Sequence, residues 1–192
     1  MKIAVVGATG LVGGLILKVL EEKGFDGCDI IAAASVNSVG KSVPFASRML
    51  TVVSVDEAIA QKPDYAIFSA GSSTSKIYAP KFAEVGTVVI DNSSAWRNEP
   101  EVPLVVPEIN IGAVDNDDRI IANPNCSTIQ MVLALSQLHA KYHIKRIVVS
   151  TYQSVSGSGM KGLGQLCNEE QAQEVSAPAY PYPIHRNLIP HG

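Results

Sequence analysis

Apolar and polar positions divide residues 1–126 into short apolar runs separated by longer stretches of helical pattern. The runs are rich in Val, Ile and Ala, without the alternation with polar residues that a half-exposed strand shows. They are residues 2–8, 29–35, 64–71, 87–94 and 119–124, and the helical patterns between them include residues 11–24, closed by Gly24, and residues 75–85. Apolar strands that are separated by helices predict an α/β fold, a Rossmann-like doubly wound parallel sheet with helices on both faces.

The pattern changes after Cys126. The elements expected there are a helix to about Tyr142, a strand in residues 144–155, a glycine-rich turn and a polar helix in residues 163–175. The stretch 176–192 contains several prolines and predicts little regular structure. We therefore expect a dinucleotide-binding domain in residues 1–126 and the first half of an incomplete α+β domain in residues 127–192.

Composition and charge limit the classes of function. With 46% hydrophobic residues, 17% charged residues and a formal net charge of −3, the chain has the composition of a soluble globular protein, and it shows no basic patch for nucleic acid. The apolar stretch 3–17 is shorter than the roughly 20 residues that span a bilayer, and no small-residue cleavage pattern follows it. We expect a cytoplasmic protein without a nucleic-acid or membrane partner.

Gly7, Gly10 and Gly13 follow the first predicted strand and open the first predicted helix. Glycines at such a junction allow a sharp turn and a close approach, while the helix N-terminus presents N–H groups and a positive dipole to a pyrophosphate. The spacing G-x-x-G-x-x-G is one residue longer in its first gap than the common fingerprint, and a turn that only packs helix on strand is the alternative. From its place at the first strand–helix junction, we expect the loop to bind a dinucleotide.

The end of the second predicted strand bears on which dinucleotide binds. Folds that bind NAD usually carry an Asp or Glu there, but residues 32–44 contain neither. Ser35, Asn37, Ser38 and Lys41 offer hydroxyl, amide and ammonium donors that suit a 2′-phosphate. This favours NADP, with a solvated polar loop as the alternative.

Cys126 stands where a predicted strand and a turn give way to a predicted helix. If Asn125 caps this helix, the dipole and N–H groups of the first turn favour the thiolate, which is the nucleophilic form. The same groups suit an oxyanion formed on a carbonyl carbon, and a small residue buried under the turn is the alternative. Cys28 and Cys167 are too widely spaced for a zinc site or a disulfide framework, and we interpret them as small apolar residues.

A thiol beside a nicotinamide predicts aldehyde chemistry through a thioester, which needs a base. His139 follows Cys126 by 13 residues, about 20 Å along a helix, and neither it nor His143 can serve. The segment from His139 to His143 lacks the glutamate of a metalloprotease motif. The favourable interaction of histidine with the dipole at a helix C-terminus therefore explains this pair better than a metal site does. Nothing directs His185 or His191 toward the thiol, and we predict no metal site.

The chain closely resembles the aspartate-semialdehyde dehydrogenase family in the segments GATGLVG, IDNSSAWR, PLVVPEIN, ANPNCSTIQM, TYQSVSGSG and YPYPIHRNLIPH. NPNCST followed by TYQ is far more specific than the glycine loop. The resemblance implies NADP-dependent reduction of aspartyl-4-phosphate to aspartate semialdehyde with release of phosphate, in the biosynthesis of lysine, threonine and methionine. It also implies a homodimer or homotetramer, with a partial substrate-binding and dimerisation domain in residues 127–192.

The resemblance assigns roles to individual residues. Cys126 would form the acyl-thioester, and Gln153 would orient the substrate beside it. Arg97, helped by Asn125, would hold the phosphate, since a guanidinium fork fits phosphate geometry. The residues implied to bind the cofactor are Thr9, Gly10, Leu11 and Val12 at the pyrophosphate, Asn37 and Ser38 at the adenosine end, and Ser156 and Gly157 on the nicotinamide side, in addition to Gly7 and Ser35 expected from the sequence pattern above.

Two departures from the family pattern matter. Asn37 stands where the family commonly has arginine, the best ligand for a 2′-phosphate, and Lys41 would compensate. The family's substrate-binding arginine and catalytic histidine lie in a segment after residue 192, and a C-terminal helix returns to the nucleotide domain. We therefore expect the 192 residues alone to be inactive or nearly so.

Other functions stay open at this point. One is a non-catalytic dinucleotide-binding module, and another is the related reduction of N-acetylglutamyl phosphate, although the cysteine motif of that reductase is less similar. A short-chain-type reductase ranks last, because Lys76 precedes Tyr78 by two residues where that chemistry places the lysine a helical turn after the tyrosine.

Overall fold

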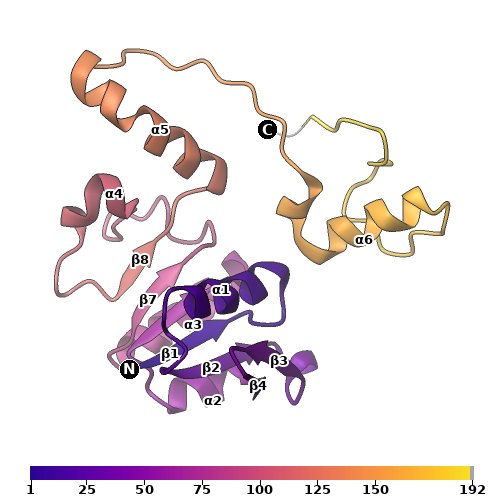
Figure 1. Cartoon of the computed structure of the whole chain (residues 1–192). Helices are drawn as coiled ribbons and strands as arrows, with labels where there is room; N and C mark the ends of the chain where they lie inside the picture. Colours follow the sequence, from indigo (N-terminus) through magenta and orange to yellow (C-terminus); the bar gives the residue numbers. More distant parts are fainter. Residues whose placement is uncertain (191–192) are drawn as a thin grey trace. The chain divides into compact units, whose positions relative to one another are not determined.

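The computed structural model describes residues 1–190 (Figure 1). Contacts divide the chain into two compact units, Met1–Lys145 and Arg146–Gly192, and each is described by itself. The first unit ends at Lys145 and therefore includes the helix that follows residue 126. The domain boundary predicted at residue 126 is a boundary of function, and it stays a prediction. Within residues 1–190, no helix has the length and apolar character needed to cross a membrane.

A six-stranded parallel sheet forms the centre of the first unit (Figure 1). In spatial order its strands are β5 (Val53–Ser54), β2 (Asp29–Ala34), β1 (Lys2–Val6), β6 (Tyr65–Phe68), β7 (Val88–Asp91) and β8 (Ile120–Ala122). All five predicted apolar runs form strands, which confirms the doubly wound fold. The chain builds β1, β2 and β5 toward one edge and then continues with β6, β7 and β8 toward the other. Its winding therefore reverses between β1 and β6.

Helices cover both faces of this sheet. They are α1 (Leu11–Glu22), α2 (Val55–Ala60) and α3 (Ser72–Glu84), and the first and last confirm the helices predicted from the sequence. Val6 packs in one hydrophobic cluster with Phe82 of α3, whereas its neighbour Val5 packs in another with Leu17 of α1. Successive strand residues point to opposite faces, so a strand covered on both sides must be apolar throughout. This explains the continuous apolar runs.

Residues 42–60 contain elements that the pattern of apolar and polar residues does not predict. An antiparallel hairpin joins β3 (Ser42–Phe45) to β4 (Arg48–Thr51), and Phe45 is buried in the cluster beside α1. At the start of α2, the hydroxyl of Ser54 accepts the N–H of Glu57 at 3.2 Å, and the carboxylate of Glu57 accepts the N–H of Ser54 at 2.8 Å. The backbone N–H of Ser54, and then its hydroxyl, lower the pKa of Glu57.

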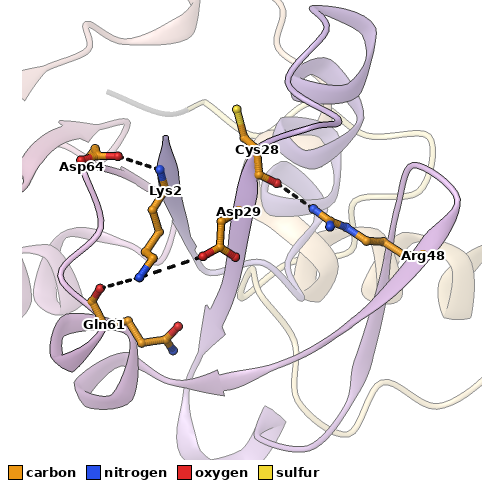
Figure 2. Close-up of polar contacts among 6 residues, drawn as sticks. All are labelled: Lys2, Cys28, Asp29, Arg48, Gln61 and Asp64. Carbon is orange, nitrogen blue, oxygen red and sulfur yellow. Dashed lines mark hydrogen bonds and ion pairs between the residues drawn. The ribbon is translucent and has the colours of Figure 1, made fainter.

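Polar contacts hold the amino ends of the strands in place (Figure 2). The backbone N–H of Lys2 donates to the carboxylate of Asp64 at 2.7 Å, and its Nζ donates to the carbonyl of Gln61 at 3.0 Å. Arg48 donates from Nη2 to the carbonyl of Cys28 at 2.7 Å. Cys28 is half-buried against the core, which fits its interpretation as a small apolar residue.

One long helix and three short ones complete the first unit. The short helices are η1 (Val36–Ser38), α4 (Pro107–Asn110) and η2 (Ile111–Ala113), and the long one is α5 (Cys126–Tyr142). The predicted end of α5 at Tyr142 is confirmed, and His143 closes it in a left-handed conformation with φ 54°. No residue of α5 is buried.

The second unit contains η3 (Val155–Ser158) and α6 (Gly159–Glu170), which begins and ends earlier than predicted. The strand predicted in residues 144–155 is wrong, because residues 143–154 form neither helix nor strand. A strand needs a neighbour for its N–H and C=O groups, and the described residues of this unit include no other strand. Cys167 is exposed on α6, so its interpretation as a small apolar residue finds no support in packing and stays a prediction.

Candidate active site

The carboxyl ends of the parallel strands meet at one edge of the sheet, where doubly wound folds bind their ligands. The glycine loop follows β1 there, the segment from Asn92 to Arg97 follows β7, and Asn125 and Cys126 follow β8. The glycine loop lies at the switch point between β1 and β6. Topology alone therefore places the predicted pyrophosphate site and the predicted nucleophile along the same edge of the first unit.

Backbone contacts hold the glycine loop against its neighbours. Gly7 has a φ of +92°, and a Cβ atom there would lie 2.9 Å from the main chain of Ser69, which follows β6. A Cβ atom on Gly13 would lie 2.1 Å from the carbonyl oxygen of Gly7. The N–H of Gly7 donates to the carbonyl of Ala33 in β2 at 2.8 Å. Both positions therefore require glycine, one for its backbone conformation and one for the close approach of α1.

The N-terminus of α1 suits an anion. Its N-cap is Gly10, which brings no side chain to the N–H groups of the first turn. Thr9, Gly10 and Val12 are exposed, and Leu11 is half-buried. Uncapped N–H groups at the positive end of a helix favour phosphate. These residues fit a dinucleotide pyrophosphate, while Gly13 serves the packing of helix on strand that was the alternative interpretation of the loop.

The η1 turn joins the end of β2 to the glycine loop. The hydroxyl of Thr9 donates to that of Ser38 at 3.4 Å, and Ser38 is only 9% exposed. Ser35, Asn37 and Lys41 are exposed. Ser38 therefore helps to fix the turn, whereas the side chains of Asn37 and Lys41 are open to solvent.

Arg97 joins the loops that follow β7 and β8. Its Nε donates to the carbonyl of Asn123 at 3.0 Å, and its Nη2 donates to the carbonyl of Asn92 at 2.9 Å. The two asparagines are also bonded, from Nδ2 of Asn123 to Oδ1 of Asn92 at 2.6 Å. Among the described residues, Nη1 of Arg97 makes no hydrogen bond, so Nη1 and the second N–H of Nη2 remain available to an anion.

Asn125 caps α5, which confirms the predicted start of this helix. Its Oδ1 accepts the N–H groups of Ser127 at 3.0 Å and Thr128 at 3.4 Å. Asn125 and Cys126 are both exposed. The alternative of a small residue buried beneath the turn is therefore wrong, and the thiol stands at the solvent-facing start of a 17-residue helix.

Gln153, Ser156 and Gly157 lie together in one turn of the second unit. The hydroxyl of Ser154 accepts the N–H of Ser156 at 3.4 Å. A Cβ atom on Gly157 would lie 2.6 Å from Nε2 of Gln153, so the side-chain amide of Gln153 lies directly against the glycine. The residues predicted to serve the substrate and the nicotinamide are neighbours within this unit.

The histidines in the described part of the chain do not belong to a metal site. His139 and His143 lie near the C-terminus of α5 with ring centroids 6.4 Å apart. His185 lies in the second unit with Nδ1 3.9 Å from the carboxylate of Glu170, and His191 is outside the described residues. Within residues 1–190, no group of three or more His, Cys, Asp or Glu side chains could hold a metal ion.

The loop after β6 is a part of this edge that the sequence pattern did not predict. Ser69 contacts Gly7 through its main chain, and Gly71, with a φ of +84°, begins α3 without a side-chain cap. A second uncapped helix N-terminus thus follows the strand next to β1. The sequence does show Gly71 after an apolar run. Its place beside the glycine loop, however, follows only from the pairing of β1 with β6.

A sheet of this order with a glycine loop at its switch point is that of the Rossmann-type nucleotide-binding domains of dehydrogenases. Residues 2–116 match the family described as "Semialdehyde dehydrogenase, NAD binding domain", and residues 135–192 match "Semialdehyde dehydrogenase, dimerisation domain". The chain belongs to the semialdehyde dehydrogenase family.

Individual relatives agree with this assignment. The chain is 50% identical over 198 residues to the aspartate-semialdehyde dehydrogenase of Aquifex aeolicus, a match that covers 99% of this chain and 58% of that protein. It is 40% identical over 201 residues to the Bacillus subtilis protein of the same name, with 99% and 58% covered. The structure of aspartate semialdehyde dehydrogenase II from Vibrio cholerae complexed with ASA matches with a TM-score of 0.90 and 41% identity, covering 99% of this chain and 58% of that one. The chain spans about 58% of the length of these curated relatives.

Proposed function

We propose that this chain provides the dinucleotide-binding part and the nucleophile of an aspartate-semialdehyde dehydrogenase. The reaction is the NADP-dependent reduction of L-aspartyl-4-phosphate to L-aspartate 4-semialdehyde with release of phosphate, which serves lysine, threonine and methionine biosynthesis. One observation carries the proposal. Cys126 stands exposed at the capped start of α5, on the same sheet edge as the glycine loop, in a chain 50% identical to a protein of that name.

The first step is nucleophilic attack by the Cys126 thiolate on the acyl carbon of the substrate. The S–C bond forms, the C–O bond to the phosphate breaks, and inorganic phosphate leaves with the electron pair. The Oδ1 atom of Asn125 is engaged in capping α5, so its Nδ2 group is left to donate to the developing oxyanion. The product of this step is a thioester on Cys126.

The second step reduces that thioester. A reduced nicotinamide bound on the Ser156 and Gly157 side would supply the hydride for this reduction. The C–S bond then breaks, the sulfur keeps the electron pair as a thiolate, and the aldehyde is released. The dipole of α5 favours the thiolate both as nucleophile and as leaving group.

Arg97 and Gln153 hold the substrate in this proposal. The N–H groups of Arg97 that are not bound to main-chain carbonyls face a phosphate with fork geometry. The amide of Gln153 orients the acyl group, and Ser156 and Gly157 in the same turn line the nicotinamide side. The half-buried state of Arg97 strengthens its hold on an anion, since a partly desolvated charge is screened less than an exposed one.

NADP is proposed over NAD. The β2 end and the η1 turn carry no carboxylate that would repel a 2′-phosphate or hold a ribose hydroxyl, and both Asn37 and Lys41 are exposed there. Lys41 supplies the positive charge, and Asn37 supplies amide donors in place of an arginine.

The division of labour in the complete protein is also a proposal. Residues 1–126 hold the cofactor, and residues 127–192 begin the substrate-binding and dimerisation domain, whose family description names dimerisation. The complete protein is a homodimer or homotetramer.

The test uses the complete protein, assayed by the absorbance of NADPH formed from aspartate semialdehyde, phosphate and NADP. We expect Cys126→Ser to lower kcat by more than about a thousandfold. Cys167→Ser replaces another exposed thiol, on α6, and should leave the rate unchanged. Equal rates for Cys126→Ser and the unaltered protein would remove the nucleophile. Faster turnover of N-acetylglutamate semialdehyde would favour the related reductase, and cofactor binding without turnover of either aldehyde would favour a non-catalytic module.

A further inference from the structure

Gln165 is the most unusual polar residue of the second unit, because it is only 3% exposed on a largely polar helix, α6. Its Oε1 accepts the N–H groups of Ala179 at 2.8 Å and Tyr180 at 3.0 Å. Its Nε2 donates to the carbonyl of Tyr182 at 3.1 Å and to Oε1 of Glu169 at 2.8 Å. A buried amide is tolerated only when it is bonded in this way, so one side chain fixes the main chain of residues 179–182 to α6.

Glu169 extends the same attachment by one helical turn. Its Oε2 accepts the N–H groups of Ile184 at 2.7 Å and His185 at 2.8 Å. Residues 179–185 contain neither helix nor strand, so their N–H groups have no ladder partner. Two side chains of α6 therefore replace secondary structure in holding this segment.

The attached segment reaches back to the turn that precedes α6. The hydroxyl of Tyr180 contacts the hydroxyl of Ser158, which is the N-cap residue of α6 but makes no side-chain capping bond there. The first turn of α6 also rests directly on η3, because a Cβ atom on Gly162 would lie 3.0 Å from the carbonyl oxygen of Val155. The hydroxyl of Ser158 is thus used for a tertiary contact with Tyr180.

A continuous chain of contacts runs from Gln165 through Tyr180 to Ser158 and into the turn that holds Gln153 and Gly157. We propose that Tyr180 and Gln165 are positioning residues, which fix the 153–158 turn and through it the amide of Gln153 that orients the substrate. This inference rests on the proposed function, and all of its contacts lie within the second unit.

The decisive variant is Tyr180→Phe in the complete protein, because it removes only the hydroxyl that meets Ser158. We expect kcat/KM for aspartate semialdehyde to fall roughly threefold to tenfold, the range of one hydrogen bond between neutral groups. If Tyr180 acts through Gln153, the same substitution in a Gln153→Ala background should change kcat/KM by less than about twofold. Tyr182→Phe is the matched control. Gln165 binds the main-chain carbonyl of Tyr182 and not its side chain, which is 65% exposed, so this substitution should leave kcat/KM unchanged.

Amide hydrogen exchange provides a second readout that does not depend on turnover. Peptides covering residues 153–158 should exchange faster in Tyr180→Phe than in Tyr182→Phe. An equal loss of kcat/KM with and without Gln153, or unchanged exchange in the turn, would overturn the positioning role. If either result is found while Cys126→Ser still abolishes turnover, only the positioning role is overturned. If the unaltered protein does not turn over aspartate semialdehyde, the proposed function is overturned and the positioning role with it.

Discussion

The guanidinium of Arg97 donates to the main-chain carbonyl of Asn123 at 3.0 Å, two residues before Asn125 caps the helix of Cys126. Because the same guanidinium also holds the carbonyl of Asn92, one side chain ties the loop after β7 to the loop that carries the thiol. In the proposed function Arg97 therefore has two roles, the support of these loops and the binding of phosphate.

Arg97→Lys should separate the two roles. Lysine keeps the charge but loses the fork, so we expect the free energy of unfolding to fall by about 1–3 kcal/mol and the KM for phosphate to rise roughly tenfold. Arg119→Lys is the control, because Arg119 is exposed and binds only nearby carbonyls. Denaturant unfolding and phosphate titration of the complete protein measure the two effects. Lost stability with an unchanged KM for phosphate would assign Arg97 a structural role alone.

Adjacent glycines of α1 should respond in opposite ways to alanine. Gly13→Ala places a Cβ atom 2.1 Å from the carbonyl oxygen of Gly7, so we expect a loss of about 1–3 kcal/mol or more and weaker cofactor binding as the loop shifts. Gly14→Ala meets nothing within 4 Å and should stabilise the helix by roughly 0.5–1 kcal/mol. Thermal unfolding and cofactor titration measure both. Similar stability for the two variants would contradict the close approach of α1 to the loop.

Asn37→Arg should shift cofactor preference toward NADP. Asn37 is exposed in the η1 turn, so an arginine there would not disturb the core, and in the proposed function its guanidinium would bind the 2′-phosphate. We expect the ratio of the Kd for NAD to the Kd for NADP to rise roughly tenfold, and Lys41→Gln to lower it. An unchanged ratio in Asn37→Arg would show that this turn does not face the 2′ position.

Acid should release residues 184 and 185 from α6. The bonds to Glu169, first from the amide of Gln165 and then from the N–H of His185, lower the pKa of Glu169 below its usual value of 4.5. A lowered folded-state pKa means that the attachment is complete above pH 4.5 and is lost as the pH falls through the lowered value. The protection of the amides of residues 184 and 185, measured relative to the intrinsic exchange rate at each pH, should therefore fall in acid.

The neighbouring glutamate provides the control for this acid transition. Glu169→Gln should weaken protection of residues 184 and 185 at neutral pH and remove the step in acid that belongs to this carboxylate. Glu170→Gln, which affects only the contact with the side chain of His185, should keep the step. An acid step that survives Glu169→Gln would assign the release to another group.

Much of the first unit could be predicted because its signals are local. The apolar runs of β1, β2, β6, β7 and β8 and the periodic pattern of α1 each lie within a few consecutive residues. The cap of α5 is equally local, since Asn125 bonds to N–H groups two and three residues further on. The resemblance to the family, carried by NPNCST and TYQ, likewise needed no coordinates.

Predictions failed where the outcome depended on a distant partner. The β-branched residues Ile147, Val148 and Val149 favour a strand, but no other strand lies among the described residues of their unit to pair with them. The hairpin from Ser42 to Thr51 is formed by short strands without a strong apolar pattern, and the buried Phe45 decides its place.

By itself the sequence determined the fold class, the family and the helix that begins at Cys126, because periodicity, capping and motif spacing act between close neighbours along the chain. Only the tertiary structure decided that β1 lies beside β6, that Arg97 reaches a carbonyl 26 residues away, and that Gln165 is buried to hold the segment that follows α6. Each of these depends on which distant residues meet once the core has formed. The free energy of such contacts depends on both partners, so no short stretch of sequence determines it.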